Sequence, residues 1–133
     1  MKRYLIKIYI NNIEKFEDIL KISNNFVIKN KVILYGGMAM NLYLPIDKRF
    51  YGPLELPDYD GFSPNPDILS KRLVVFLKKN NYNYLMVKNA IHEGTYKVSW
   101  EFIDVLDLTY LCCVHYIVCY FQTILQVYRT IFQ

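Results

Sequence analysis

The hydrophobic pattern changes from helical to strand-like within the N-terminal third of the chain. Apolar side chains recur three or four positions apart in 12–22, which predicts an amphipathic helix ending at Asn24-Asn25. Residues 31–35 (KVILY) are mostly β-branched or aromatic and lead into a glycine pair, so they predict a short buried strand. The next run, 38–44, consists of helix formers and predicts a second helix.

The remaining pattern predicts a loop, a third helix and three strands. Residues 47–57 contain glycine and prolines and predict the loop. Asn65 can cap a helix that starts at Pro66 and runs to Asn80. The strands are expected at 84–87, 95–100 and 103–108, the last two as an antiparallel pair. This order of elements predicts an α/β or α+β fold.

The chain changes character after Asp107. From Leu108 onward it has no Lys, Asn, Asp or Glu, and all three cysteines lie there. We therefore divide it into a domain of residues 1–107 and a hydrophobic tail of residues 108–133. A packed terminal helix is the favoured interpretation of the tail. A membrane span is long enough but disfavoured, because polar residues interrupt it. A non-native or truncated continuation is the third interpretation, which the abrupt change of composition supports.

Composition narrows the class of protein without identifying it. With 133 residues, 53% hydrophobic and 21% charged, the chain predicts one folded domain. A net charge of +4 is compatible with a phosphate-rich partner. The cysteines and His115 lack the paired two-residue spacing of zinc sites, so we expect thiols in a reducing compartment.

Gly36 and Gly37 stand where the predicted strand meets the next helix. The first N–H groups of a helix have no partner within the helix, and together with the helix dipole they favour phosphate. Glycine also lets phosphate oxygens approach the backbone closely. The pair is therefore a candidate nucleotide-binding site, with a plain strand-to-helix turn as the alternative.

Asp58 and Asp60 flank Tyr59 in the run DYD. Residues two apart on a strand project to the same face, so the two carboxylates would point together. They repel unless a cation lies between them, and Mg²⁺ takes carboxylate oxygens together with substrate phosphates. Both are candidate metal ligands, with a solvated acidic turn between Pro57 and Gly61 as the alternative.

Two more acids, Asp104 and Asp107, each lie between apolar residues on the last predicted strand. They are three positions apart, so on a regular strand they face opposite sides and only one can join the site. A two-metal centre needs a shared carboxylate, flanking carboxylates and a donor-rich cradle for the triphosphate. The glycine pair, the DYD run and one later acid together supply these groups.

The order strand, Gly-Gly, helix, Asp-x-Asp, helix and later strand acid resembles the nucleotidyltransferase superfamily typified by DNA polymerase beta. Three runs resemble, more narrowly, the poly(A) polymerase catalytic subunits of large nucleocytoplasmic DNA viruses: YGGMAMNLYLP (35–45), LPDYDGFSPNP (56–66) and HEGTYKVSW (92–100). The resemblance covers roughly residues 30–108. It implies a nucleotidyltransferase palm, a mixed twisted sheet with helices mainly on one face, followed here by a hydrophobic C-terminal helix.

By this resemblance, Gly36 and Gly37 would hold the triphosphate of ATP. Asp58, Asp60 and Asp107 would be the catalytic residues and the ligands of Mg²⁺ or Mn²⁺. Asp107 is preferred over Asp104 because of its Leu-Asp-Leu context downstream of the HEGT run.

The activity implied is template-independent addition of AMP from ATP to RNA 3′ ends, in the host cytoplasm or the virion, with no membrane partner favoured. Two alternatives stay open: a minimal nucleotidyltransferase that modifies another acceptor, and a catalytically silent truncated palm that acts as a binding partner. Members of the family are several times longer, so a homo-oligomer or a missing C-terminal domain is also left open as a partner.

Overall fold

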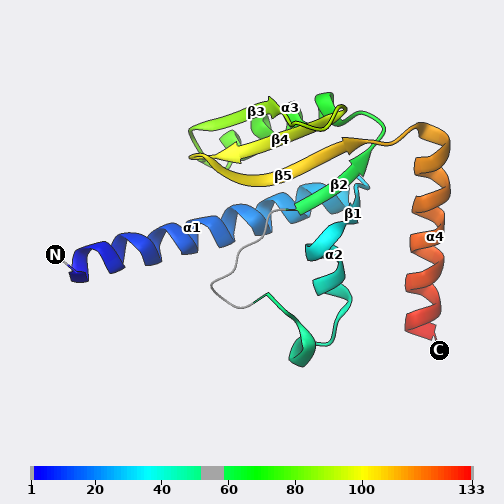
Figure 1. The fold of residues 1–133 in the computed structure, drawn as a ribbon, viewed down its shortest axis with the longest axis horizontal. Coiled ribbons are helices and arrows are strands. Elements are labelled where there is room, and N and C mark those ends of the chain that lie inside the picture. The colour runs from blue at the N-terminus through cyan, green and yellow to red at the C-terminus, as the bar shows by residue number, and fades with distance from the viewer. Residues whose placement is uncertain (1, 52–58, 133) are drawn as a thin grey trace.

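The computed structural model describes residues 2–51 and 59–132. Its helices are α1 (Lys2–Lys29), α2 (Gly36–Tyr43), α3 (Pro66–Lys79) and α4 (Cys113–Phe132), with a short 3-10 helix, η1 (Ile46–Lys48). Its strands are β1 (Ile33–Tyr35), β2 (Tyr59–Ser63), β3 (Leu85–Asn89), β4 (Thr95–Trp100) and β5 (Ile103–Tyr110). The strands form one mixed sheet in the order β1-β2-β5-β4-β3 (Figure 1). Only β2 and β5 pair in parallel.

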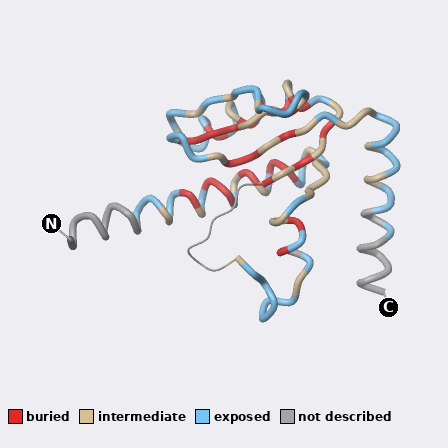
Figure 2. The backbone as a smooth tube through the Cα atoms, viewed as in Figure 1, coloured by how far each residue is buried: buried red, intermediate tan, exposed pale blue. Residues whose placement is uncertain are grey.

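Helices α1 and α3 pack on the same face of the sheet, the arrangement of an α+β fold. The core consists of apolar side chains from α1, α3 and the three central strands: Phe16, Ile19, Leu20, Phe26, Val27, Tyr59, Leu69, Leu73, Leu77, Val98, Trp100, Val105, Leu106 and Leu108. Figure 2 shows these buried stretches meeting between the sheet and the C-terminal half of α1. The mixed sheet with helices mainly on one face is confirmed.

The first helix is longer than predicted at its C-terminal end. It continues through Asn24 and Asn25, because Phe26 and Val27 extend the apolar stripe into the core. It ends where Asn30 turns back: the backbone N–H and the side-chain Nδ2 of Asn30 both donate to the carbonyl of Phe26, at 3.0 and 2.8 Å. Asn24 and Asn25 have low helix propensity, but burial of Phe26 and Val27 gains more free energy than this propensity costs.

A β-bulge interrupts the pairing of β4 with β5. Val98 pairs with Leu106, but the next residue, Ser99, pairs with Asp104, so Val105 has no partner of its own. Val105 and Leu106 are both fully buried in the core although they are adjacent in sequence. The bulge therefore shifts the alternation of side chains along β5 by one residue. Two residues that would face opposite sides of a regular strand lie on the same face when the bulge is between them.

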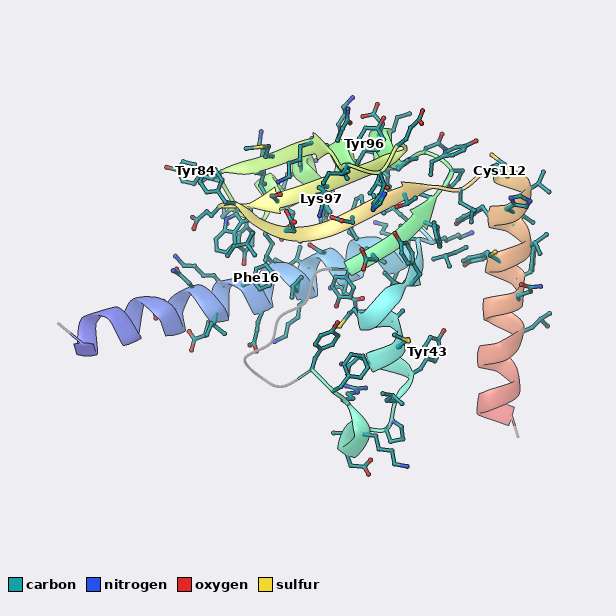
Figure 3. All side chains as sticks on the ribbon, in the orientation of Figure 1. Phe16, Tyr43, Tyr84, Tyr96, Lys97 and Cys112 are labelled. Carbon is teal, nitrogen blue, oxygen red and sulfur yellow. The ribbon has the colours of Figure 1, made fainter. Side chains whose placement is uncertain are left out.

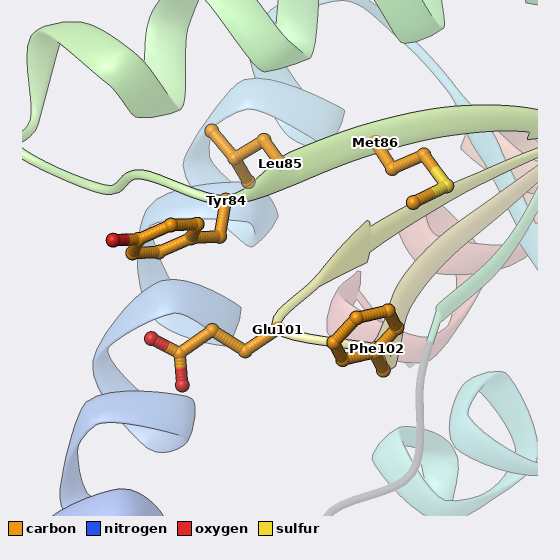
Figure 4. Close-up of a pocket in the computed structure, with 5 residues that line it drawn as sticks. All are labelled: Tyr84, Leu85, Met86, Glu101 and Phe102. Carbon is orange, nitrogen blue, oxygen red and sulfur yellow. The ribbon is translucent and has the colours of Figure 1, made fainter.

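The connection between β4 and β5 is a two-residue turn, Glu101-Phe102. Both residues have positive φ, 48° and 70°, as a type I′ hairpin turn requires. Phe102 is exposed and lines, with Glu101, Tyr84, Leu85 and Met86, a shallow cleft of about 520 Å³ (Figure 4). This cleft lies at the β3–β4 end of the sheet, whereas β2 is on the other side of β5.

Helix α4 projects away from the sheet (Figure 1). The prediction of a packed helix is wrong for five of its apolar positions, which are all at least half exposed: Val114, Ile117, Val118, Phe121 and Leu125. A hydrogen bond from the Tyr116 hydroxyl to the carbonyl of Lys31 fixes its first turns beside β1. Among the described residues, no helix combines the length and the apolar character that crossing a bilayer demands.

Candidate active site

The parallel pairing of β2 with β5 brings two of the predicted carboxylates together. Asp60 lies directly opposite Asp107 in the register, and paired residues in neighbouring strands project to the same face. The flanking side chains of Tyr59 and Leu108 are buried in the core on the other face. Asp60 and Asp107 therefore stand side by side on the face of the sheet that α1 and α3 do not cover.

Gly36 lies against this pair. It is the first residue of α2, has φ +76°, and a Cβ added to it would come 2.9 Å from Oδ2 of Asp60. The backbone conformation favours glycine here, and a larger residue would also have to displace the Asp60 carboxylate. Tyr35, at the N-cap, makes no side-chain capping hydrogen bond. The N-terminal turn of α2 is brought to the carboxylates, as the strand–Gly-Gly–helix pattern predicted.

Asp58 lies outside the described residues, so its part in the site stays a prediction. Gly37 follows Gly36 in α2, and the hydroxyl of Tyr51 lies against the place where a Cβ of Gly37 would be. Tyr51 is held there by Asn41 of α2, whose Oδ1 accepts hydrogen bonds from the backbone N–H groups of Phe50, at 3.0 Å, and Tyr51, at 3.3 Å. Sequence reasoning missed both Asn41 and Tyr51.

Lys97 is the third charged group of the site, and the sequence analysis missed it too. It lies on β4 (Figure 3), directly opposite Asp107 in the register, and its Nζ is 2.8 Å from Oδ2 of Asp107. The same Nζ is 3.0 Å from Oδ2 of Asp104. A detectable signal was present in the sequence, because Lys97 and Ser99 alternate with the apolar residues Val98 and Trp100 along the strand.

The expectation that Asp104 and Asp107 face opposite sides is wrong. A regular strand would separate them, but the bulge at Val105 inserts one residue and returns Asp104 to the face of Asp107. Both carboxylates therefore reach the ammonium of Lys97. Only Asp107 lies opposite Asp60, whereas Asp104 pairs with Ser99, whose hydroxyl donates to it at 2.8 Å.

The charges of these groups act on one another. Burial raises the pKa of Asp60, the neighbouring charge of Asp107 raises it further, and Lys97 partly opposes both effects. Burial also opposes ionisation of Asp104, but the hydrogen bonds from Lys97 and Ser99 and the nearby lysine charges outweigh it, so its pKa is lowered. The hydrogen bond to Asp107 raises the pKa of Lys97, which is thus a permanent cation at neutral pH.

Hydrogen bonds among three hydroxyl groups fix the position of the glycine pair relative to β5. The Tyr35 hydroxyl is 3.0 Å from Oγ1 of Thr109, which is 2.9 Å from Oγ1 of Thr95. The ring of Tyr35 also stacks on Phe62, with centroids 4.1 Å apart. The HEGT run forms the tight turn that leads into Thr95, with Gly94 at φ +78°. Thr95 of that run thus connects β4 to β5.

The residues present fit a divalent cation at this position. Oδ1 of Asp107 is buried and has no hydrogen-bond partner among the described residues, although Oδ2 is paired with Lys97. A buried carboxylate oxygen without a partner is costly, and a hard cation shared with Asp60 would satisfy it. Within residues 2–51 and 59–132, no three His, Cys, Asp or Glu side chains gather closely enough to hold a metal by themselves. Asp60 and Asp107 could therefore supply two carboxylates to a cation, with the other ligands coming from outside the described side chains.

Comparison with known proteins decides the family. The model of the poly(A) polymerase catalytic subunit family matches residues 21–126, most of the chain. The chain belongs to this family. Proteins assigned as poly(A) polymerase catalytic subunits in African swine fever virus, for example in isolates Kenya 1950 and Malawi Lil 20-1, are 35% identical to it over 101 residues. The match covers 75% of this chain and 21% of each relative.

A solved structure supports the same conclusion. The polyadenylate synthase of Megavirus superposes with a TM-score of 0.72 at 25% identity, covering 78% of this chain and 22% of that chain. The chain therefore spans about a fifth of the length of these relatives, and its fold is similar to that of the matching segment of the Megavirus protein.

Proposed function

We propose that this chain is the palm of a template-independent nucleotidyltransferase that adds AMP from ATP to the 3′ end of RNA. The observation that carries the proposal is the pairing of Asp60 with Asp107 beside Gly36, at the start of a helix. Membership of the poly(A) polymerase catalytic subunit family supports it. The viral origin of the relatives supports a site of action in the host cytoplasm or the virion.

Each residue has a separate part in the proposed reaction. Asp58, Asp60 and Asp107 would hold Mg²⁺ or Mn²⁺, which supplies charge neutralisation of the triphosphate and acidifies the acceptor hydroxyl. The backbone N–H groups of Gly36 and Gly37 would hold the β- and γ-phosphates of ATP. Asp107 would also receive the proton of the RNA 3′-hydroxyl, through the carboxylate oxygen that does not bind the metal.

The bonds exchanged follow from this arrangement. The RNA 3′-oxygen attacks the α-phosphorus in line, the bond between the α-phosphorus and the bridging oxygen breaks, and pyrophosphate leaves. Positioning and stabilisation of charge would supply most of the rate, since the protein provides no nucleophile of its own.

The test is transfer of label to RNA by the full chain with Mg²⁺, offered labelled ATP, CTP, GTP and UTP in turn. We expect an RNA ladder with ATP. The variant Asp107→Asn should lower the rate by about 10²–10³-fold, the cost typical of losing one transition-state stabilising group. Asp58→Asn should do the same. The matched control Asp67→Asn removes an exposed carboxylate of α3 that pairs only with Lys71, and should leave the rate unchanged.

The outcomes separate the alternatives. Undiminished transfer by Asp107→Asn would overturn the assignment of the site. Label that enters protein rather than RNA indicates a nucleotidyltransferase with another acceptor. A folded chain that neither transfers label nor binds nucleotide in calorimetry is the silent palm.

A further inference from the structure

The ammonium of Lys97 lies between two carboxylates of one strand, Asp104 and Asp107. Its Nζ is 2.8 Å from Asp107 and 3.0 Å from Asp104, so one ammonium serves both at once. The two acids can meet it only because the bulge at Val105 turns Asp104 to the same face. Asp104 itself takes no place beside Asp60, because it lies opposite Ser99.

The two carboxylates differ in what surrounds them. The side chain of Asp107 is 13% exposed and stands next to Asp60, where an added cation would bind. The side chain of Asp104 is 34% exposed and is supported from three directions, by Lys97, by the Ser99 hydroxyl and by Lys88 at 3.8 Å. A positive charge held at Asp104 therefore stays paired and close to solvent, whereas one held at Asp107 competes with any cation that binds there.

We propose that Lys97 is an internal competitor for the metal at Asp107, and that Asp104 is the carboxylate onto which it withdraws when the metal binds. This inference rests on the proposed function, because it takes Asp107 as a metal ligand. Without metal, the ammonium neutralises Oδ2 of Asp107 and limits the repulsion between Asp107 and Asp60. With metal, the ammonium gives up that contact but keeps a carboxylate partner, so no buried charge is left unpaired.

We call this movement of the Lys97 ammonium from Asp107 to Asp104 the exchange. It predicts that replacing Lys97 and replacing Asp104 change the metal affinity in opposite directions. Lys97→Met removes the competing charge, so Mn²⁺ should bind about five- to tenfold more tightly. Asp104→Asn removes the place to which Lys97 withdraws, so Mn²⁺ should bind more weakly by a similar factor. In the double variant, the loss of Asp104 should have no further effect, since no ammonium remains to be held. A purely structural role of the pair predicts weaker binding in both single variants.

The experiment measures Mn²⁺ binding to the full chain without nucleotide, by the electron paramagnetic resonance signal of the free ion. The matched control is Lys88→Met, which removes a lysine near Asp104 that does not reach Asp107, and its affinity should stay within about twofold of wild type. Thermal unfolding of each variant verifies that the protein is folded. Should Lys97→Met prove unstable, Lys97→Gln takes its place, because it removes the same charge and leaves a polar side chain. Unchanged Mn²⁺ affinity in Asp104→Asn would by itself overturn the exchange, because asparagine keeps the size of the side chain and can accept the Ser99 hydrogen bond.

Each result points to one conclusion. Opposite shifts for Lys97→Met and Asp104→Asn support the exchange. Equal affinities in all variants, with wild type binding Mn²⁺ and transferring AMP, overturn the exchange and leave the proposed function standing. A wild-type chain that binds no Mn²⁺ and transfers no label overturns both.

Discussion

The two faces of strands β4 and β5 differ in almost every physical respect. On one face, Val98, Leu106 and Leu108 are fully buried against α1 and α3. On the other, Lys97 and Asp107 pair across the same two strands and remain partly open to solvent. Alternation along a strand thus places the side chains that hold the fold and those that bind charge on adjacent residues.

Substitutions on the two faces of β4 and β5 should therefore alter stability and chemistry separately, although the residues of the two faces are neighbours in the sequence. The buried face gains free energy by removing apolar surface from water. On the charged face, the ionised carboxylate of Asp60 opposes folding, since burial and the charge of Asp107 both raise its pKa. The predictions below test this division.

The largest effect is expected on the buried face. Leu106→Ala leaves a cavity at a fully buried position of the central strand, and should lower the free energy of unfolding by about 2–5 kcal/mol, measured by urea denaturation. The control Ile103→Ala, on the same strand but 43% exposed, should cost less than about 1 kcal/mol. A loss below 1 kcal/mol for Leu106→Ala would contradict the separation of the two faces.

An intermediate effect is expected where the charged face meets α2. Gly36→Ala must adopt φ +76° and bring its Cβ to 2.9 Å from Asp60, so it should cost about 1–2 kcal/mol of stability and displace the carboxylate. Mn²⁺ affinity should fall in parallel, as calorimetry would measure. Met40→Ala, an exposed position of the same helix, is the control and should change neither quantity. Normal Mn²⁺ binding by Gly36→Ala would show that Asp60 is not constrained by this contact.

The smallest effect is a gain of stability on the charged face. Because the pKa of Asp60 is raised above its ordinary 3.8, folding favours the protonated carboxyl, and the ionised form costs stability once the pH exceeds that raised pKa. Asp60→Asn should therefore be more stable than wild type at neutral pH in a chelating buffer, by less than about 1 kcal/mol. The gain should disappear as the pH falls through the raised pKa to below 3.8. Lower stability of Asp60→Asn at pH 7 would refute this account.

Most of the fold could be predicted from the sequence, because its signals are local. The strand at Thr95–Trp100 and the helix start at Pro66 follow from β-branched runs and from a proline after a capping residue type. The end of α1 could not be predicted, since it depends on burial of Phe26 and Val27 against distant strands. The exposed apolar positions of α4 look like core positions in sequence for the same reason.

The site was predictable in its acids and glycines but not in its cation. Asp60, Asp107 and Gly36 belong to motifs whose order along the chain predicts that they come together, as the structure shows, whereas their chemistry stays a prediction. The positions of Lys97 and Asp104 in the site depend on a β-bulge that no local residue type predicts. The alternation of side chains along a regular strand would place Asp104 on the face opposite to Asp107, which is wrong.

The parallel pairing of β2 with β5 has a consequence for how this chain acquires its chemistry. Asp60 and Asp107 are neighbours in space, but α3, β3 and β4 lie between them along the chain. Closing so long a loop is an entropic barrier that local contacts do not lower, so the carboxylate pair forms only when the final strand enters the middle of the sheet. During synthesis on the ribosome, the carboxylate pair is therefore absent until β5 has emerged, so the proposed site cannot assemble on a partly synthesised chain.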